Sequence, residues 1–309
     1  MPLLFLLAGV SARYSLERNS AGAWFKSCTR KLLVPATIGL LVFHWMTSYF
    51  NTHLTGVDVL AAVPQPVKYF LWVFSGVGPL WFIQDLWLFS LLLLLVRKID
   101  AADRLYRAKF SAVWIFLLGI IFLLAHQALV CNLRPESLDG LWNLYQPVFY
   151  FILFLMGYYI FSRDEVQEIL GQYWILLMTL AVVSGVAFVV TTFGANYTLS
   201  QYIAGPFYNL YGWLMCMAMM GWFKARFDRT GPFATYMTRS SFGLYVVHYL
   251  VVVGLGSILY RHTTLPPWAD YAILTVAVFG LSPLLYEILH RIPFIRWCLF
   301  GIKKNRSME

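Results

Sequence analysis

One carboxylate lies in a segment of the chain that is otherwise free of charge. Asp85 is the only Asp, Glu, Lys or Arg among the 28 residues from Tyr69 to Val96. A carboxylate on a segment that lipid surrounds is costly unless protein or water meets it, so such a residue marks a functional site by default. The chemistry that we expect of Asp85 is to orient a histidine base or to bind substrate hydroxyls. The alternative is a hydrogen bond between helices, or an acid just below the membrane surface.

Three histidines also lie in apolar segments, and histidine is the residue that most often serves as a general base near neutral pH. For His248 a catalytic role stands beside a structural one, in which the ring bonds to a carbonyl. His44 and His126 can serve as polar contacts between helices. We also predict that His44, together with Trp81, contacts a substrate.

The composition defines the class of protein. Hydrophobic residues make up 60% of the chain and charged residues 12%, which excludes an ordinary soluble domain. Runs without charge, long enough to cross a bilayer, recur along the chain. They are Leu32–Val57, Tyr69–Val96 (broken only by Asp85), Phe110–Leu133, Gly140–Ser162, 173–193, 202–223 (separated from the preceding run by a turn at Gly194-Ala195-Asn196), Ser240–Tyr260 and 268–289. We predict an all-α polytopic integral membrane bundle of about nine helices, eight full spans and a shorter first one, as a single domain over residues 1–309.

The basic residues predict the orientation of this bundle. If the loop at 13–31 is cytoplasmic, alternating topology places 97–109, 163–168, 224–239 and 290–309 on the same side. With the 13–31 loop, these five stretches hold 20 of the 23 Lys and Arg residues. Such a split is a strong positive-inside signal and predicts a cytoplasmic C-terminus. The basic excess is thereby explained by the lipid bilayer, without a nucleic-acid partner. This topology puts Asp85, His44 and His126 in the outer half of the membrane and His248 nearer the middle or inner half.

The first apolar segment is short. Met1–Ala12 is hydrophobic, but at about 1.5 Å per residue it covers roughly 18 Å of a hydrocarbon core of about 30 Å. It lacks the basic start of a signal peptide. We expect that at least one helix, and the start of this one, precede Met1 in a longer protein. The alternative is a short re-entrant start.

Three stretches resemble one family in their order and spacing, and a fourth, at the end of the chain, also fits. They are Pro2–Gly9 with Ser15–Arg18 and Arg30–Pro35, then Gly78–Leu86, then Ser240–His248, and finally Arg291–Trp297. The chain resembles acyltransferase family 3, which consists of integral-membrane enzymes that O-acylate cell-surface carbohydrates. In such enzymes the first helix carries a basic residue and a histidine regarded as the catalytic base. That helix would precede Met1, so the resemblance implies the same missing segment, and His248 stands in for the base.

The resemblance implies a reaction with two substrates. An acyl-CoA donor, which we expect to be acetyl-CoA, would bind on the cytoplasmic side, with Arg30 and Arg13 holding its phosphates. The alternative is that these basic residues serve topology alone. The acceptor would be a hydroxyl of an extracytoplasmic carbohydrate or cell-envelope glycan, at the inner (plasma) membrane. Asp85 and His248 would be catalytic, and Trp81 and His44 would bind the acceptor. The cysteine spacing predicts no metal site. A transporter and a non-enzymatic membrane subunit are the alternatives.

Overall fold

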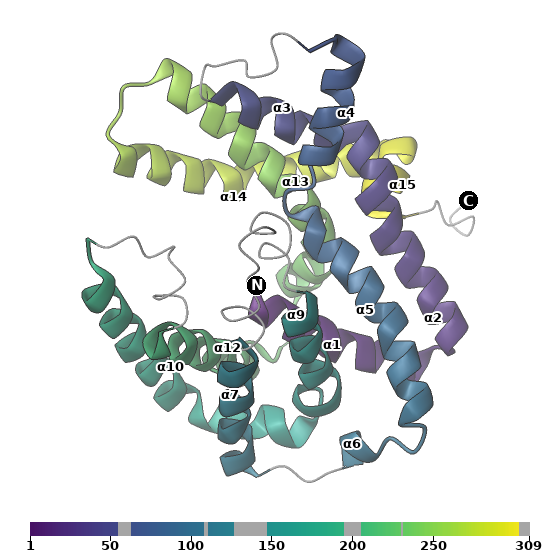
Figure 1. Cartoon of the computed structure of the whole chain (residues 1–309), viewed down its shortest axis with the longest axis vertical. Helices are drawn as coiled ribbons and strands as arrows, with labels where there is room; N and C mark the ends of the chain where they lie inside the picture. Colours follow the sequence, from purple (N-terminus) through teal and green to yellow (C-terminus); the bar gives the residue numbers. More distant parts are fainter. Residues whose placement is uncertain (55–62, 108–110, 127–146, 195–204, 230, 303–309) are drawn as a thin grey trace. The chain divides into compact units, whose positions relative to one another are not determined.

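The structure is a computed structural model that describes residues 1–54, 63–107, 111–126, 147–194, 205–229 and 231–302. All regular secondary structure in these ranges is helical (Figure 1), which confirms the predicted all-α fold class. Five helices there are long and apolar enough to cross a membrane. They are Ala21–Thr52, Leu80–Ile99, Asp164–Thr192, Pro232–His262 and Pro267–Arg291. The chain is therefore an all-α polytopic membrane bundle.

Three further predicted spans are represented by helices of different extent. The span predicted at 110–133 corresponds to α7 (Ala112–His126), and the one at 140–162 to α9 (Pro147–Met156) followed by the π-helical η5 (Gly157–Phe161). The outer parts of both predictions, and most of the turn predicted at 194–196, lie outside the described residues. The helix predicted at 202–223 corresponds to α12 (Pro206–Phe227).

The charge-free run Tyr69–Val96 is divided between two helices. Helix α4 (Gln65–Ser75) ends before the turn Gly76–Pro79, and α5 (Leu80–Ile99) begins directly after it. Gly78 in this turn has a φ of 40°, a conformation that glycine adopts at little cost. Pro79 has no backbone N–H to continue the preceding helix. The turn thus fixes where the helix that carries Asp85 begins.

The segment predicted as a loop at 13–31 is mostly helical, and the expected end of the first helix at Ala12 is wrong. Helix α1 (Pro2–Arg18) continues to Arg18, and α2 (Ala21–Cys28) and the π-helical η1 (Thr29–Leu33) follow. Arg13 Nε donates to Glu17 Oε1 at 2.8 Å. A pair at this spacing stabilises the last turn of a helix.

Proline marks the start of many of these helices. It occupies a position in the first turn of α1, α4, α12, α13 (Pro232–His262), α14 (Pro267–Arg291) and α15 (Pro293–Phe300). The first helical residues have no intrahelical partner for their N–H groups, so proline loses nothing there, and its fixed φ already suits the helix.

The chain divides into two compact units. Unit 1 comprises Met1–Trp24 and Phe89–Arg229, and unit 2 comprises Phe25–Leu88 and Thr230–Glu309. Each unit has buried apolar residues of its own. The single domain expected for residues 1–309 stays a prediction.

In unit 1 the helices approach one another closely at glycines. A Cβ atom on Gly9 of α1 would lie 2.1 Å from the Phe154 carbonyl oxygen, and one on Gly157 would lie 2.1 Å from the Leu6 carbonyl oxygen. Helix α10 (Asp164–Thr192) runs beside α12 (Figure 1), where a Cβ on Gly221 would lie 2.3 Å from the Leu170 carbonyl oxygen. Small residues that bring backbones together are typical of helix packing in membranes.

Unit 2 contains the π-helical η2 (Pro35–His44) and α3 (Trp45–Leu54), with α4, the start of α5, and α13 to α15. Helix α15 packs on η2, where a Cβ on Gly39 would lie 3.0 Å from the Cys298 carbonyl oxygen. Helix α13 packs on α14, and a Cβ on Gly243 would lie 2.1 Å from the Tyr286 ring. These contacts fix α13, the helix that carries His248.

Candidate active site

The candidate site in unit 2 surrounds the Gly76–Pro79 turn. A Cβ on Gly76 would lie 2.6 Å from the carbonyl oxygen of His44, at the end of η2. A Cβ on Gly78 would lie 3.0 Å from the ring of Tyr249 on α13. The turn is therefore enclosed by the elements that carry His44 and His248, and it leads directly into the helix that carries Asp85.

Asp85 is half-buried on the second turn of α5. Its Oδ2 atom is shielded from solvent, and no described residue donates a hydrogen bond to it. The flanking residues fix this side of the helix, because Gln84 Nε2 donates to the Ala36 carbonyl at 3.4 Å and Trp87 Nε1 donates to Thr29 Oγ1 at 3.1 Å. An unpaired, shielded carboxylate oxygen is suited to accept a hydrogen bond from a substrate hydroxyl.

The hydrogen bond of His248 determines its tautomer. Nδ1 lies 2.7 Å from the carbonyl oxygen of Tyr245, one turn earlier on α13. A carbonyl oxygen can only accept, so Nδ1 carries the proton and Nε2 carries the lone pair of the neutral ring. The hydrogen bond to a carbonyl, which the sequence predicts if His248 has a structural role, is thus present. It also leaves Nε2 in the form that a general base requires.

Tyr245 joins the two helices that carry these groups. Its hydroxyl donates to the Pro79 carbonyl oxygen, and its ring centroid lies 5.4 Å from that of Phe82. One turn further along α13, Tyr249 meets Gly78, and Asp85 lies one turn after Phe82 on α5. The described residues form no hydrogen bond between Asp85 and His248. The group that holds His248 Nδ1 in the described structure is the Tyr245 carbonyl, and the orienting role of Asp85 stays a prediction.

The two residues predicted to bind the acceptor also lie near this turn. His44 is 1% exposed, and neither of its ring nitrogens has a hydrogen-bond partner among the described residues. Its ring stands edge-on to Phe43, with centroids 5.6 Å apart. Trp81 is on the first turn of α5, half-buried, and its ring meets Phe82 edge-on at 6.5 Å. A buried polar ring without a partner is rare in a folded protein. His44 is therefore a stronger candidate for substrate binding than Trp81.

Arg30 lies in unit 2, on η1, and is exposed. Its carbonyl oxygen would lie 2.3 Å from a Cβ on Gly301, which has a φ of 63° and follows α15. The backbone of Arg30 is thus fixed by the glycine after α15. Because its side chain is exposed, it can reach a phosphate.

Arg13 lies in unit 1 and is 8% exposed. Besides the bond to Glu17, its NH1 group lies 2.8 Å from an oxygen of Asp103, and its guanidinium carbon lies 3.7 Å from the centroid of the Tyr106 ring. Burial alone would lower the pKa of Arg13, but the hydrogen bonds to Asp103 and Glu17 outweigh it and raise the pKa above its usual value. A donor phosphate would have to displace these carboxylates. The network instead ties α1 to the segment after α5.

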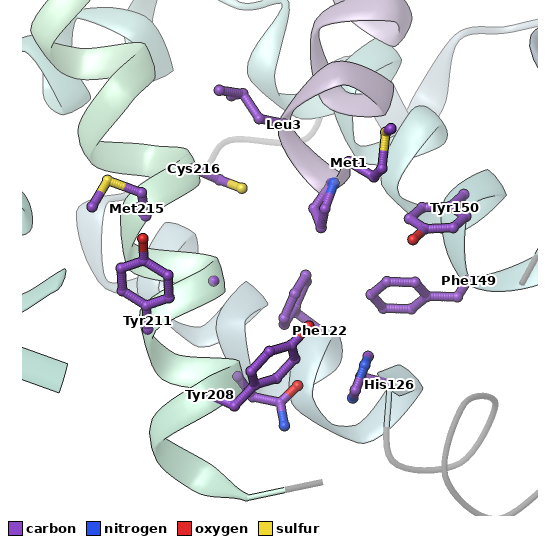
Figure 2. Close-up of a pocket in the computed structure, with 13 residues that line it drawn as sticks. Met1, Leu3, Phe122, His126, Phe149, Tyr150, Tyr208, Tyr211, Met215 and Cys216 are labelled. Atoms are coloured by element: carbon purple, nitrogen blue, oxygen red, sulfur yellow. The ribbon is translucent and has the colours of Figure 1, made fainter. Parts of the chain in front are cut away.

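Unit 1 contains a cavity of about 340 Å³ that the sequence analysis did not anticipate. Figure 2 shows His126 at its edge, beside the rings of Phe149, Phe122 and Tyr208. The His126 ring centroid lies 5.3 Å from that of Phe149 and 6.1 Å from that of Tyr208. Asn209 also lines the cavity. An aromatic wall with uncharged polar side chains is suited to a neutral ligand. The one sequence feature that pointed to this cavity is His126, a histidine in an apolar segment. From the sequence alone, His126 is interpreted as a polar contact between helices.

Comparison with known proteins identifies the family of this all-α membrane protein. A family model described as an acyltransferase domain matches residues 1–287. The chain belongs to acyltransferase family 3 and is an acyltransferase, as the resemblance of its motifs predicts. Comparison with curated proteins and with solved structures gave no match.

A first prediction concerns the contact between Tyr245 and the turn. Tyr245→Phe removes the hydroxyl that donates to the Pro79 carbonyl, and the loss of one hydrogen bond to a partly buried acceptor costs about 1 kcal/mol. We expect acyl transfer to fall about tenfold, as a loss of roughly 1.4 kcal/mol in positioning would give, with a lower unfolding temperature. Tyr249→Phe is the matched control, because its ring packs on Gly78 and that contact survives the change. Equal activity of the two variants would contradict the proposed positioning.

Proposed function

We propose that this protein transfers an acyl group, acetyl from acetyl-CoA, to a hydroxyl of an extracytoplasmic or cell-envelope carbohydrate. Membership of acyltransferase family 3 supports acyl transfer in general. The observation that carries the hydroxyl acceptor is the tautomer of His248, which has a hydrogen bond at Nδ1 and therefore a basic Nε2. A hydroxyl is a weak nucleophile, and a positioned base is what activates it.

In the proposed reaction, His248 acts as the general base for acyl transfer to the acceptor hydroxyl. Nε2 of His248 removes the proton of the acceptor hydroxyl as its oxygen attacks the thioester carbonyl of the donor. A C–O bond forms, the C–S bond breaks, and the departing thiolate takes up the proton that His248 holds. The products are the acyl ester and free CoA. Negative charge develops on the carbonyl oxygen during the attack, so a hydrogen-bond donor must lie beside it.

The other predicted residues have roles in binding. Asp85 would accept a hydrogen bond from a second hydroxyl of the acceptor, and Trp81 and His44 would contact the same molecule. Arg30 is the better of the two basic residues for the donor phosphates, because its side chain is exposed whereas Arg13 is bound to two carboxylates. The excess of basic residues on one side supports a multi-pass protein of the inner (plasma) membrane with its C-terminus in the cytoplasm.

The test measures release of CoA. Membranes from cells that express the gene of this chain are supplied with acetyl-CoA labelled in the acetyl group and with purified envelope polysaccharide. We expect thiol release that depends on the polysaccharide, with an equal amount of label in the polysaccharide as an alkali-labile ester. His248→Gln should lower both by about 100-fold or more.

The control is His262→Gln, the same change at an exposed position on the same helix. It should keep full activity. A membrane in which labelled acetyl groups cross without joining the polysaccharide would favour the transporter, and one with no thiol release would favour a non-enzymatic subunit. Full activity of His248→Gln would place the base on another residue.

A further inference from the structure

Unit 1 has a groove between α1, α10 and α12, which adjoins the cavity beside His126 at Leu3. It encloses about 450 Å³. Its apolar walls include Leu3, Leu7 and Val10 of α1, and Met219, Met220 and Phe223 of α12. The three α1 residues recur at helical spacing and so form one stripe along the helix. We call this feature the α1–α12 groove.

The length of the groove matches one leaflet of a bilayer. Its α1 wall runs from Leu3 to Tyr14, and at about 1.5 Å per residue this distance is roughly 16 Å. Half of a hydrocarbon core of about 30 Å is similar. Leu7 is 42% exposed and Phe223 is 51% exposed, so the groove opens along its side. An apolar groove open to its surroundings on a membrane helix faces acyl chains.

One end of the groove is polar. Tyr14, Gln167, Lys224 and Asp228 all line it there, at the end of α1, the start of α10 and the end of α12. The Tyr14 hydroxyl donates to the Ser162 carbonyl at 3.1 Å. In the predicted topology, this is the cytoplasmic side, at the depth of the headgroups.

The charges at this end have both signs. Lys224 Nζ lies 2.7 Å from Asp228 Oδ2. An ammonium has three donors and a carboxylate has several lone pairs, so the two groups can bind each other and a ligand at once. A phosphate would bind Lys224, and an ammonium would bind Asp228, each through a charge-assisted hydrogen bond. A purely anionic headgroup would gain only the first of these and would be repelled by the carboxylate.

We propose that the α1–α12 groove binds one phospholipid with a zwitterionic ethanolamine headgroup. One acyl chain lies along the stripe of Leu3, Leu7 and Val10, and the headgroup lies between Lys224 and Asp228. The two methionines of α12 suit this ligand, because a flexible thioether side chain adapts to a mobile apolar chain. The site is independent of the acyl-transfer reaction.

The test counts lipids retained by the purified full chain. The protein is exchanged into detergent with equal amounts of phosphatidylethanolamine and phosphatidylglycerol of identical acyl chains and is studied by native mass spectrometry. We expect one bound phosphatidylethanolamine, favoured about tenfold over phosphatidylglycerol, the ratio that corresponds to 1.4 kcal/mol. Equal binding of the two lipids, or preference for phosphatidylglycerol, would overturn the proposal.

Two variants locate the lipid. Leu7→Trp fills the groove and should abolish the bound lipid, whereas Val190→Trp, at a position of α10 that is 71% exposed, should retain it. The double variant Lys224→Gln, Asp228→Asn keeps the apolar walls and should remove the tenfold preference. These two side chains are 32% and 64% exposed, so the change is compatible with folding even if Leu7→Trp is not. Unchanged preference in the double variant would contradict the assigned headgroup site.

Discussion

Gly157→Ala is expected to destabilise unit 1 strongly. The added Cβ would lie 2.1 Å from the carbonyl oxygen of Leu6 and 3.1 Å from its Cα. Both are backbone atoms, so no side-chain rotation can relieve the clash, and α1 must move away from η5. Overpacking of this kind costs about 3 kcal/mol. For a protein of this size, that lowers the unfolding temperature by roughly 6–12 °C, measured on the detergent-solubilised protein by fluorescence-detected size exclusion after heating.

The same crossing predicts a reciprocal effect. A Cβ on Gly9 would lie 2.1 Å from the Phe154 carbonyl oxygen and 2.7 Å from the Tyr158 nitrogen, so Gly9→Ala should destabilise the protein about as much. Gly256→Ala on α13 is the control, since a Cβ there meets nothing within 4 Å. In a helix interior this change should stabilise by up to about 1 kcal/mol. If Gly157→Ala and Gly256→Ala unfolded at the same temperature, the close approach of α1 and η5 would be refuted.

The helices could be predicted from the sequence far better than their contacts. Charge-free runs and the turn residues between them are local signals, and they placed the spans from Leu32 onward close to the helices of the structure. The crossing of Gly9 and Gly157 has no local signal, because it depends on two segments that meet only after folding. The extension of α1 to Arg18 was missed for a similar reason. A basic residue at position 13 suggests a loop, whereas Glu17 and Asp103 neutralise it within the fold.

The candidate site shows the same limit. An acid and histidines in apolar segments are conspicuous in a sequence, so Asp85, His44 and His248 could be selected without a structure. The Gly76–Pro79 turn, which meets the His44 carbonyl and the Tyr249 ring, was visible only as part of a motif. The hydrogen bond from Tyr245 to Pro79 joins residues that are 166 positions apart, and nothing in the sequence distinguishes Tyr245 from the other 18 tyrosines for that role. The phosphate role predicted for Arg13 could not be weighed without knowing that Asp103 lies beside it.

Asp85→Asn is expected to lower kcat/KM for acyl transfer by about 100-fold while leaving the protein folded. The amide has nearly the shape of the carboxylate, and the bonds of the neighbours Gln84 and Trp87 to Ala36 and Thr29 are untouched. Because Oδ2 is shielded without a partner in the described part of the chain, removing its charge relieves a desolvation cost. The unfolding temperature should therefore stay the same or rise. Loss of activity with equal or greater stability is the pattern of a functional group, not of a structural one.

The kinetic constants then separate the two roles that Asp85 could have. If the carboxylate binds an acceptor hydroxyl equally well before and during the reaction, KM for the polysaccharide rises and kcat is kept; if it acts only in the transition state, kcat falls and KM is kept. The described residues form no hydrogen bond between Asp85 and His248, which favours the first result. The control is Asp270→Asn, in the first turn of α14. The Asp270 carboxylate accepts a hydrogen bond from the Thr263 hydroxyl at 3.2 Å and is not one of the predicted site residues. Full activity of the Asp85→Asn variant would show that Asp85 is not part of the site. The free-energy cost of a carboxylate in the membrane would then need a purely structural explanation.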